Sequence, residues 1–449
     1  MNAIIHVIFL KGENNMKIAF MGAGSTIFAK NIIGDCILTP EFGEFEVFLH
    51  DIDPQRLEDS ERILKTINKT HNGKCTIRAS LNRREALKDA DYVVNAIQVG
   101  GLECTLTDFE VPKKYGLQQT IADSMGIGGI FRALRTIPVL QDFANDIEEL
   151  CPNALFLNYS NPMSMLTGYM LKHTKVRTVG LCHSVQVVTN QLLRPIDMSE
   201  YIGKCRYEVA GINHQAWLLK ITDLDGNDLY PEAKRRSKMT DKYDMKHDLV
   251  RRDLLNKFGY YLTESSEHNA EYNPWFIKKQ YPEFIEKYNI PIDEYIRRCH
   301  EQIDGWVKMR EDLLKDPHLN HTKTYEYGSY IIKACETDEP FKIAGNVLNK
   351  NLIPNLPYDS CVEVPCLVDR NGINPCYVGN LPEQCAAINR VSINVQNLTI
   401  MAAAERKKEY IYMAAMMDPH ASAELSTDEI ISMCDDLIEA HGDWMPKYN

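Results

Sequence analysis

A short apolar run that ends in closely spaced glycines constrains the fold of this chain more than any other feature. Lys17-Ile-Ala-Phe-Met-Gly-Ala-Gly-Ser-Thr26 is typical of a strand that turns at its glycines, and the apolar residues from Ile27 to Ile33 predict a helix directly after it. Such glycines let the backbone approach a pyrophosphate, while the helix N-terminus supplies free N–H groups and a positive dipole. Because Ile27 replaces the third glycine of the usual pattern, the motif needs support from its context. The predicted cofactor contacts are Gly22, Gly24, Ser25 and Thr26.

The next predicted strand supports a dinucleotide-binding unit. Glu46-Val-Phe-Leu-His-Asp-Ile-Asp53 is apolar and then acidic, and either Asp51 or Asp53 could bind the ribose hydroxyls. An acid at this place favours NAD over its 2′-phosphorylated form, which would require an arginine. The open alternative is a purely structural β–α–β unit in which the acids cap the following helix.

Polar side chains also follow the later strands of the predicted sheet. Asp91–Gly100 is predicted to be a strand that ends beside the cofactor at Asn95 and Gln98, and Ala154–Pro162 is a strand that ends near Asn161. Ligands of open α/β sheets bind beyond the carboxyl ends of the strands. We therefore expect these side chains to line one edge of the sheet together with Gly22 and Asp51.

Two more apolar runs end in groups that can bind a metal or move a proton. Val179-Gly-Leu-Cys-His-Ser-Val185 carries Cys182 and His183, and Ala210-Gly-Ile-Asn-His214 carries His214. Thiolate and imidazole are common metal ligands, and a second imidazole can exchange a proton near neutral pH. Buried cysteine and histidine are also ordinary core residues, so these runs alone leave that alternative open. Convergence with the other strand ends favours a site.

Composition narrows the class of protein and its partners. A chain of 449 residues is long enough for two domains, and its net charge of −12 with a pI near 5.6 argues against nucleic acid and anionic membranes as partners. No apolar run reaches the length of about 18–20 residues that a membrane span requires. Thirteen irregularly spaced cysteines indicate a reducing compartment, and we expect the cytoplasm.

The predicted organisation is an N-terminal Rossmann-type α/β domain of the kind found in lactate and malate dehydrogenases, followed by an α+β substrate domain. Residues 1–15 are expected to lie outside the fold, residues 16–200 to bind NAD, and residues 201–449 to carry substrate, metal and oligomer contacts. The segment Phe258–Trp275 is rich in carboxylates, imidazole and tyrosines, which favours a wall of the site. A helix is expected over Ile292–Leu314.

Several of these motifs together closely resemble glycoside hydrolase family 4. The resemblance runs from Met16 to the C-terminus, and the residues after the cysteine resemble those of the α-galactosidase branch; phospho-glycosidase branches carry Asp or Asn where His183 stands. The motifs are Asn158-Tyr-Ser-Asn-Pro162, Cys182-His-Ser-Val185, Gly211-Ile-Asn-His214, Leu262-Thr-Glu-Ser-Ser-Glu-His268, Met416-Met-Asp-Pro-His420 and Ala440-His-Gly-Asp-Trp444.

The resemblance implies hydrolysis of terminal α-galactosides by an unusual route that depends on NAD and Mn²⁺. Bound NAD⁺ takes a hydride from C3 of the sugar, and the resulting ketone acidifies the C2 proton. A base removes that proton, the glycosidic oxygen leaves by elimination, water adds, and the hydride returns. The overall reaction is hydrolysis without net redox change.

The resemblance also implies a role for individual residues. Cys182 and His214 would bind Mn²⁺, and His183 would protonate the leaving oxygen or, alternatively, bind the sugar hydroxyls. The C2 base would come from Tyr260–Tyr272. The implied base is Glu267, with Tyr261 and Tyr272 as alternatives. Asp108 would be an acid that strengthens the base, and Asn161 would bind the substrate.

The sequence leaves other functions open. The substrate could be an α-glucoside or an α-galacturonide rather than an α-galactoside, because a single His-Ser pair carries the distinction. A 2-hydroxy-acid dehydrogenase would share the N-terminal architecture but would have no Cys–His metal pair, and a non-catalytic NAD sensor would have no use for it. The family is commonly dimeric or tetrameric, so we expect a homo-oligomer.

Overall fold

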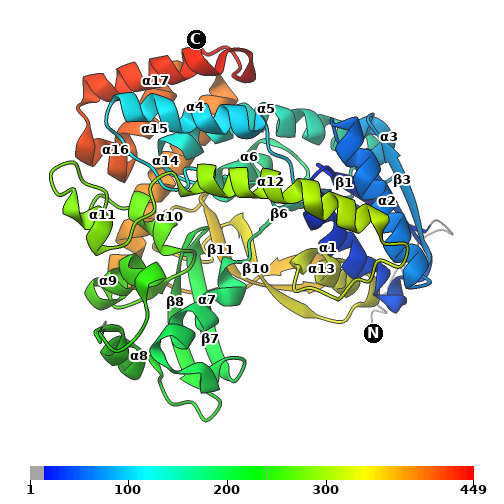
Figure 1. Ribbon diagram of the computed structural model, residues 1–449, viewed down its shortest axis with the longest axis horizontal. Coiled ribbons are helices and arrows are strands. Elements are labelled where there is room, and N and C mark those ends of the chain that lie inside the picture. The colour runs from blue at the N-terminus through cyan, green and yellow to red at the C-terminus, as the bar shows by residue number, and fades with distance from the viewer. Residues whose placement is uncertain (1–14, 240) are drawn as a thin grey trace, which may run out of the picture.

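A computed structural model describes residues 15–239 and 241–449, and its strands form one mixed sheet of twelve strands (Figure 1). The expectation for residues 1–15 falls outside this part of the chain except for Asn15, and β1 begins at Met16. The strands are β1 (Met16–Met21), β2 (Phe45–His50), β3 (Cys75–Ser80), β4 (Tyr92–Asn95), β5 (Leu155–Asn158), β6 (Arg177–Leu181), β7 (Cys205–Ile212), β8 (Gln215–Asp223), β9 (Tyr261–Leu262), β10 (Phe341–Leu348), β11 (Cys361–Asp369) and β12 (Gly372–Pro375).

The first six strands confirm the predicted Rossmann-type half. They pair in parallel in the order β3-β2-β1-β4-β5-β6, which is the usual order of a doubly wound dinucleotide-binding sheet. In this order β1 lies between β2 and β4, so the chain reverses its direction across the sheet beside the glycine turn. A crevice for a ligand is expected at that reversal.

The remaining strands extend the same sheet with antiparallel pairing and confirm the α/β fold with a C-terminal α+β part. The order continues β6-β10-β11-β7-β8-β9, with β12 attached to β11. The late strand β10 thus separates β6 from β7, which is next after it in the chain. In the sheet, β10 and β11 lie between β6 and β7, although β7 directly follows β6 among the strands of the chain.

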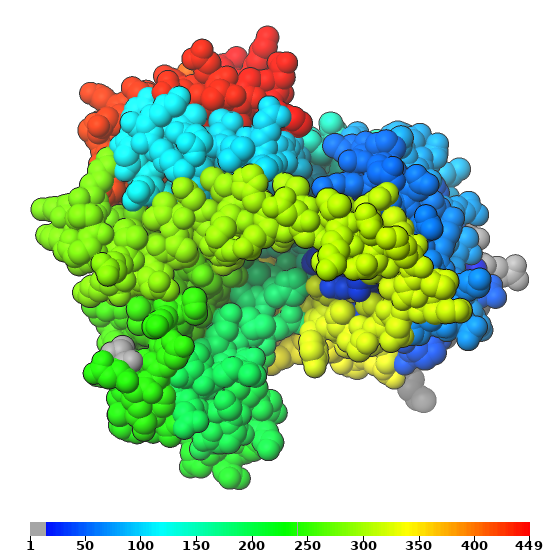
Figure 2. All heavy atoms as spheres, viewed as in Figure 1, coloured from blue at the N-terminus to red at the C-terminus, as the bar shows by residue number. Residues whose placement is uncertain are grey.

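Helices cover both faces of the sheet, and α12 crosses the front of the molecule as a long yellow-green band in Figures 1 and 2. None of the described helices is long and apolar enough to cross a membrane. The helices are α1 (Thr26–Ile37), α2 (Pro54–Thr70), α3 (Arg83–Leu87), α4 (Gly101–Lys114), α5 (Gly126–Leu150), α6 (Met163–His173), α7 (Ser184–Leu193), α8 (Tyr230–Ser237), α9 (Leu249–Phe258), α10 (Ser266–Glu271), α11 (Glu283–Lys287), α12 (Glu294–Lys315), α13 (Tyr327–Thr337), α14 (Glu383–Glu405), α15 (Lys408–Met417), α16 (Pro419–Glu424) and α17 (Thr427–His441).

Two sequence expectations about local structure need correction. The strand expected over Asp91–Gly100 ends at Asn95, because the chain then turns through Gly100 at a positive φ of 81° into α4. The sequence predicts that Glu383 to Ala440 is helical with a break at Asp418-Pro-His420; the chain breaks there, but it also breaks at Arg406, which has a φ of 57°. The helix expected over Ile292–Leu314 is confirmed as α12.

Candidate active site

A cavity of about 380 Å³ opens beyond the carboxyl ends of β5 and β6. Figure 2 shows this face of the molecule hollowed beneath α12. Both halves of the chain line the cavity, and the residues that carry its chemistry are Asn161, Cys182, His183, His214, Glu264 and His268. The structure therefore brings together the Cys–His pair that the sequence placed on two separate strands.

Cys182 and His214 meet one carboxylate at the floor of this cavity. Cys182 Sγ, an imidazole nitrogen of His214 and a carboxylate oxygen of Glu264 all lie within 4.8 Å of one another. His214 directs Nε2 toward Glu264 Oε2 at 3.4 Å, while its Nδ1 lies 3.4 Å from the hydroxyl of Tyr272 behind it. A thiolate, an imidazole and a carboxylate at this spacing form a donor set that a divalent cation can bind.

Charge at this floor supports the same interpretation. Burial alone would lower the pKa of His214, but Glu264 and Cys182 outweigh it and raise the pKa to about 10. Burial would likewise raise the pKa of Glu264, yet the neighbouring His214 and His268 lower it. Negative charge is therefore concentrated around His214, which is the environment that a bound cation would neutralise.

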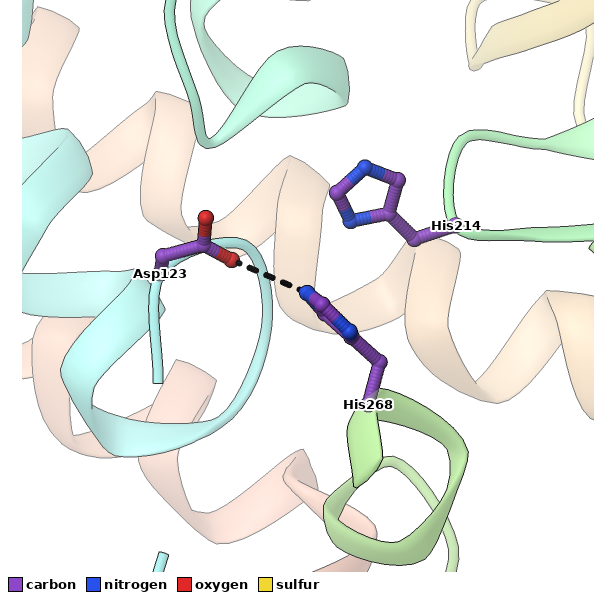
Figure 3. A group of neighbouring side chains, drawn as sticks. All are labelled: Asp123, His214 and His268. Carbon is purple, nitrogen blue, oxygen red and sulfur yellow. Dashed lines mark ion pairs between the residues drawn. The ribbon is translucent and has the colours of Figure 1, made fainter. Parts of the chain in front are cut away.

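His268 and Asp123 form a second pair beside His214 (Figure 3). His268 Nε2 lies 3.6 Å from Asp123 Oδ1, and the rings of His268 and His214 pack edge to face with their centroids 5.0 Å apart. Asp123 Oδ2 also accepts a hydrogen bond of 3.2 Å from Asn161 Nδ2, so the pair reaches the predicted substrate ligand. Together the two histidines and their carboxylates make one continuous polar wall.

The loop that carries Asp123 is held by a buried carboxylate. Glu271 of α10 is 2% exposed and accepts hydrogen bonds from the backbone N–H groups of Thr120, Ile121 and Ala122 at 2.8–3.2 Å. These bonds hold Ala122 at a φ of 52°, a left-handed conformation that costs a residue other than glycine on the order of 1 kcal/mol. The loop is thereby fixed to the segment that provides His268.

His183 has a carboxylate partner from the second half of the chain. Its Nε2 lies 2.6 Å from Oε2 of Glu326, the residue that precedes α13, and this hydrogen bond raises the pKa of His183. The ring also packs against Phe28 at 6.2 Å and Tyr159 at 6.3 Å. His183 is therefore oriented at the mouth of the cavity rather than packed into a core.

A larger cavity of about 770 Å³ adjoins the first one at Phe28. Gly24, Ser25, Thr26 and Gln98 line one wall as predicted, and α12 provides the opposite wall. A Cβ on Gly24 would lie 2.7 Å from Asp51 Oδ2, so only glycine fits there, and no side chain caps the N-terminus of α1 among the described residues. A cavity beside uncapped helix N–H groups suits the pyrophosphate of a dinucleotide.

The other predicted cofactor residues do not line this cavity. Asp51 accepts hydrogen bonds from the N–H groups of Gly24 (2.7 Å) and Asp53 (2.9 Å), which shapes the glycine turn. Asp53 caps α2, the structural role that the sequence left as the alternative. Asn95 is fully buried and donates to Asn158 and Ser160. Gly22 lies at the end of β1 with a φ of 86°.

None of the predicted bases faces the substrate cavity. Glu267 points to Arg298 at 3.5 Å and lines a separate cavity of about 250 Å³. Tyr261 is buried against Asp248, to which its hydroxyl donates at 2.7 Å, and Tyr272 contacts His214 from behind. The physical reason is helical geometry: α10 begins at Ser266, and consecutive helical residues diverge by about 100°, so His268 faces the cavity and Glu267 does not.

Asp108 is also placed away from the cavity. Both of its carboxylate oxygens bind the guanidinium of Arg135 at 2.6 and 3.0 Å, and Oδ1 also meets Nε2 of His441 at 2.9 Å. All three side chains are buried, and they join α4, α5 and the end of α17. This arrangement gives Asp108 a structural role in the described fold.

Sequence reasoning missed four residues of the site: Asp123, Glu264, His268 and Glu326. Glu264 and His268 lie in the segment that was predicted to form a wall, so the segment was identified but the inward-facing residues were not. Asp123 lies just before α5 in the glycine-rich segment Gln119–Gly129, and glycines at this spacing suit a simple turn as well as a ligand cradle. Glu326 carries no local signal, because its partner His183 is more than 140 residues away.

The comparisons with known proteins cover most of the chain. A family model described as family 4 glycosyl hydrolase matches residues 17–198, and a model of the C-terminal domain of the same family matches residues 209–421. The chain belongs to glycosyl hydrolase family 4. An α-galactosidase of Bacillus subtilis (strain 168) is 58% identical over 433 residues, which covers 96% of this chain and 99% of the relative.

Other members of family 4 are more distant. An α-galactosidase of Rhizobium meliloti (strain 1021) is 34% identical over 449 residues, covering 97% of this chain and 90% of the relative. The 6-phospho-β-glucosidase of Thermotoga maritima, whose structure contains manganese, NAD⁺ and glucose-6-phosphate, superposes with a TM-score of 0.77 at 20% identity over 97% of this chain and 100% of that one. At that identity the likeness concerns the fold of family 4.

We predict that Asp108 stabilises this family 4 hydrolase and does not act in its reaction. Asp108→Asn should lower the free energy of unfolding by about 3–5 kcal/mol, because it leaves the buried charge of Arg135 without a full partner. Activity measured well below the unfolding transition should stay close to that of the wild-type protein. The control Glu110→Gln changes an exposed carboxylate of the same helix and should alter neither quantity. Loss of activity by a fully folded Asp108→Asn would instead give Asp108 a catalytic role.

Proposed function

We propose that this family 4 glycosidase hydrolyses terminal α-galactosides of the melibiose type with NAD and Mn²⁺. The observation that carries the proposal is that the cavity lined by Cys182 and His214 shares Phe28 with a second, larger cavity that the glycine turn lines. A plain 2-hydroxy-acid dehydrogenase does not need such a pair, and it is no longer an alternative for a member of family 4. The relative at 58% identity is an α-galactosidase, which favours this sugar over α-glucosides.

We assign the binding of the two cofactors to residues that suit them chemically. Cys182 and His214 would hold Mn²⁺ over the cavity floor, and the turn from Gly24 to Thr26 with Gln98 would hold NAD. When bound, NAD would accept and return a hydride at C3 of the sugar, and Mn²⁺ would stabilise negative charge on the sugar oxygens. Asp51 would act through its hydrogen bond to Gly24 rather than through the ribose.

The chain's own side chains would move the protons. We give the role of C2 base to Glu264, which lines the cavity, rather than to Glu267, which does not. Glu264 is held at a φ of 65°, and strained residues of this kind concentrate at functional sites. His183, oriented by Glu326, would give a proton to the glycosidic oxygen, and Asn161 would bind a sugar hydroxyl.

The charge of the cavity favours a neutral sugar over an anionic one. Its lining residues include the carboxylates of Asp123 and Glu264. Its three histidines already have carboxylate partners, and no lysine or arginine lines it among the described residues. A uronate or a phosphorylated sugar brings a negative charge that requires a cationic partner. We therefore favour α-galactosides over α-galacturonides, although α-galacturonidases are also relatives at 28% identity or less.

We predict a large preference for the neutral substrate. 4-Nitrophenyl α-galactoside should be cleaved with a kcat/KM at least about 100-fold higher than that of 4-nitrophenyl α-galacturonide, because like charges brought together cost several kcal/mol. Both substrates release the same chromophore, so the difference reflects the sugar alone. Equal rates would contradict the argument from charge, and the proposed substrate class would have to be widened.

The elimination route has a direct isotopic test. Hydrolysis in D₂O should place deuterium at C2 of the released galactose, because the C2 proton is removed and later replaced from solvent. Mass spectrometry and NMR of the product measure the label. A product without deuterium at C2 would reject the elimination step.

The metal pair predicts a joint loss of metal and activity. Cys182→Ser removes the soft ligand and should abolish both Mn²⁺ binding, measured by electron paramagnetic resonance, and hydrolysis. Cys376→Ser changes an exposed cysteine elsewhere and should leave both unchanged. A Cys182→Ser protein that binds Mn²⁺ as tightly as the wild type would exclude the thiol as a ligand.

The remaining expectations stay predictions. All thirteen cysteines lie in the described part of the chain and are free thiols, which supports a reducing compartment such as the cytoplasm. We propose residues 16–200 as the part that binds the cofactor through the glycine turn and residues 201–449 as the substrate part, although residues of both parts line each of the two cavities. A homo-oligomer is expected from the family resemblance, and no nucleic-acid or membrane partner is expected from the charge.

A further inference from the structure

A fully buried carboxylate, Glu363 of β11, lies between the two strands that carry the proposed metal ligands. Its exposed fraction is 0%, and it is opposite Gly211 in the pairing of β11 with β7. On its other side it is opposite Asn346 of β10, which in turn is opposite Gly180 of β6. One row of paired residues therefore crosses the sheet from the strand of Cys182 to the strand of His214.

Hydrogen bonds of Glu363 reach both ends of this row. Oε1 accepts from Nδ2 of Asn346 at 3.2 Å and from Nδ2 of Asn213 at 3.4 Å. Asn346 Nδ2 also donates to the carbonyl of Gly180 at 3.2 Å, two residues before Cys182. Asn213 directly precedes His214. A single carboxylate oxygen is therefore tied to the backbone near one ligand and to the neighbour of the other.

The turn that carries His214 needs such a tie. Ile212 and Gln215 pair with each other, so Asn213 and His214 form a two-residue turn, and His214 has a φ of 61°. A residue other than glycine in this left-handed conformation is disfavoured by about 1 kcal/mol or more and persists only where its surroundings hold it. The far side of the turn is held by Asn389 of α14, whose Nδ2 donates to the carbonyl of Gln215 at 2.8 Å. Glu363 holds the near side.

We propose that Glu363 is a positioning residue that holds the His214 turn against the strand of Cys182 and thereby sets the affinity for the metal. The inference rests on the proposed Cys182–His214 site. Glu363 itself does not line the cavity and is not a proposed ligand. Its effect on metal affinity therefore passes through its hydrogen bonds with Asn213 and Asn346. Residues that orient ligands in this way typically change metal affinity by about 10–100-fold when they are lost.

The arrangement of donors allows two matched variants of Glu363. Both amides donate to Oε1, whereas Oε2 has no partner among the described residues. In Glu363→Gln the amide oxygen can take the place of Oε1 and keep both hydrogen bonds while the charge is removed. Glu363→Met has a similar shape but accepts no comparable hydrogen bond. The pair separates positioning by hydrogen bonds from the effect of charge.

The experiment measures the dissociation constant of Mn²⁺ by electron paramagnetic resonance on reduced protein without substrate. Glu363→Met should weaken binding by about 10–100-fold, and Glu363→Gln should restore affinity close to that of the wild type. The control Asn349→Ala removes a fully buried amide whose side chain bonds to its own loop and not to Asn213 or Gly180, and should leave the affinity unchanged. Circular dichroism checks that each variant is folded.

Each outcome decides one claim. Wild-type affinity in folded Glu363→Met, or equal weakening in Glu363→Gln, would overturn the positioning role. If Glu363→Met does not fold, Asn213→Ala breaks the same tie at the turn; about 10-fold weaker binding supports the inference, and unchanged binding rejects it. His214→Ala tests the site itself: if it binds Mn²⁺ normally, the proposed metal pair is wrong, independently of Glu363.

Discussion

The pairing of β10 with β6 is the constraint on which the site depends. Only Gly345 and Asn346 of β10 pair with β6, opposite Leu181 and Gly180, immediately before Cys182. This contact converts a parallel sheet into an antiparallel one and brings β11, β7 and β8 in behind it. A Cβ on Gly180 would lie 2.5 Å from Thr167 Oγ1 and 2.9 Å from Asn346 Cβ, so the close approach requires glycine. Cofactor turn, thiol and imidazole can then meet at one edge.

Strained backbone marks the walls of the site, and buried polar groups hold it in place. Ala122, His214 and Glu264 all have φ between 52° and 65°, and all lie in or beside the substrate cavity. Each such residue costs on the order of 1–3 kcal/mol, which the surrounding structure must offset. Glu271 provides three hydrogen bonds to the loop of Ala122, and Asn389 and Asn213 secure the turn of His214. Rigidity is thus built into the fold around the reacting groups.

Local sequence patterns were sufficient for the first half of the fold and for locating Cys182 and His214 at the ends of two strands. The glycine turn after β1 and the order of the parallel strands follow from short-range rules, so both could be predicted. Cys182 and His214 were found because each ends an apolar run. Glu267 was assigned as the base from the family resemblance, with Tyr261 and Tyr272 as alternatives, and the sequence does not show where α10 begins. On a helix, neighbouring residues face directions about 100° apart, so the sequence could not show that His268 faces the cavity and Glu267 does not.

The sequence by itself determined the chemistry that is available: glycines for a phosphate, a thiol and an imidazole for a metal, and acids in one polar segment. Only the tertiary structure decided which of these groups work together. It separated Asp108 and Glu267 from the cavity, joined His183 to Glu326, and placed Glu363 between the two ligand strands. The physical reason is that hydrogen bonds and charge interactions act over a few ångströms, while the groups involved are separated in the chain by 27 residues for Asp108 and Arg135 and by 143 for His183 and Glu326.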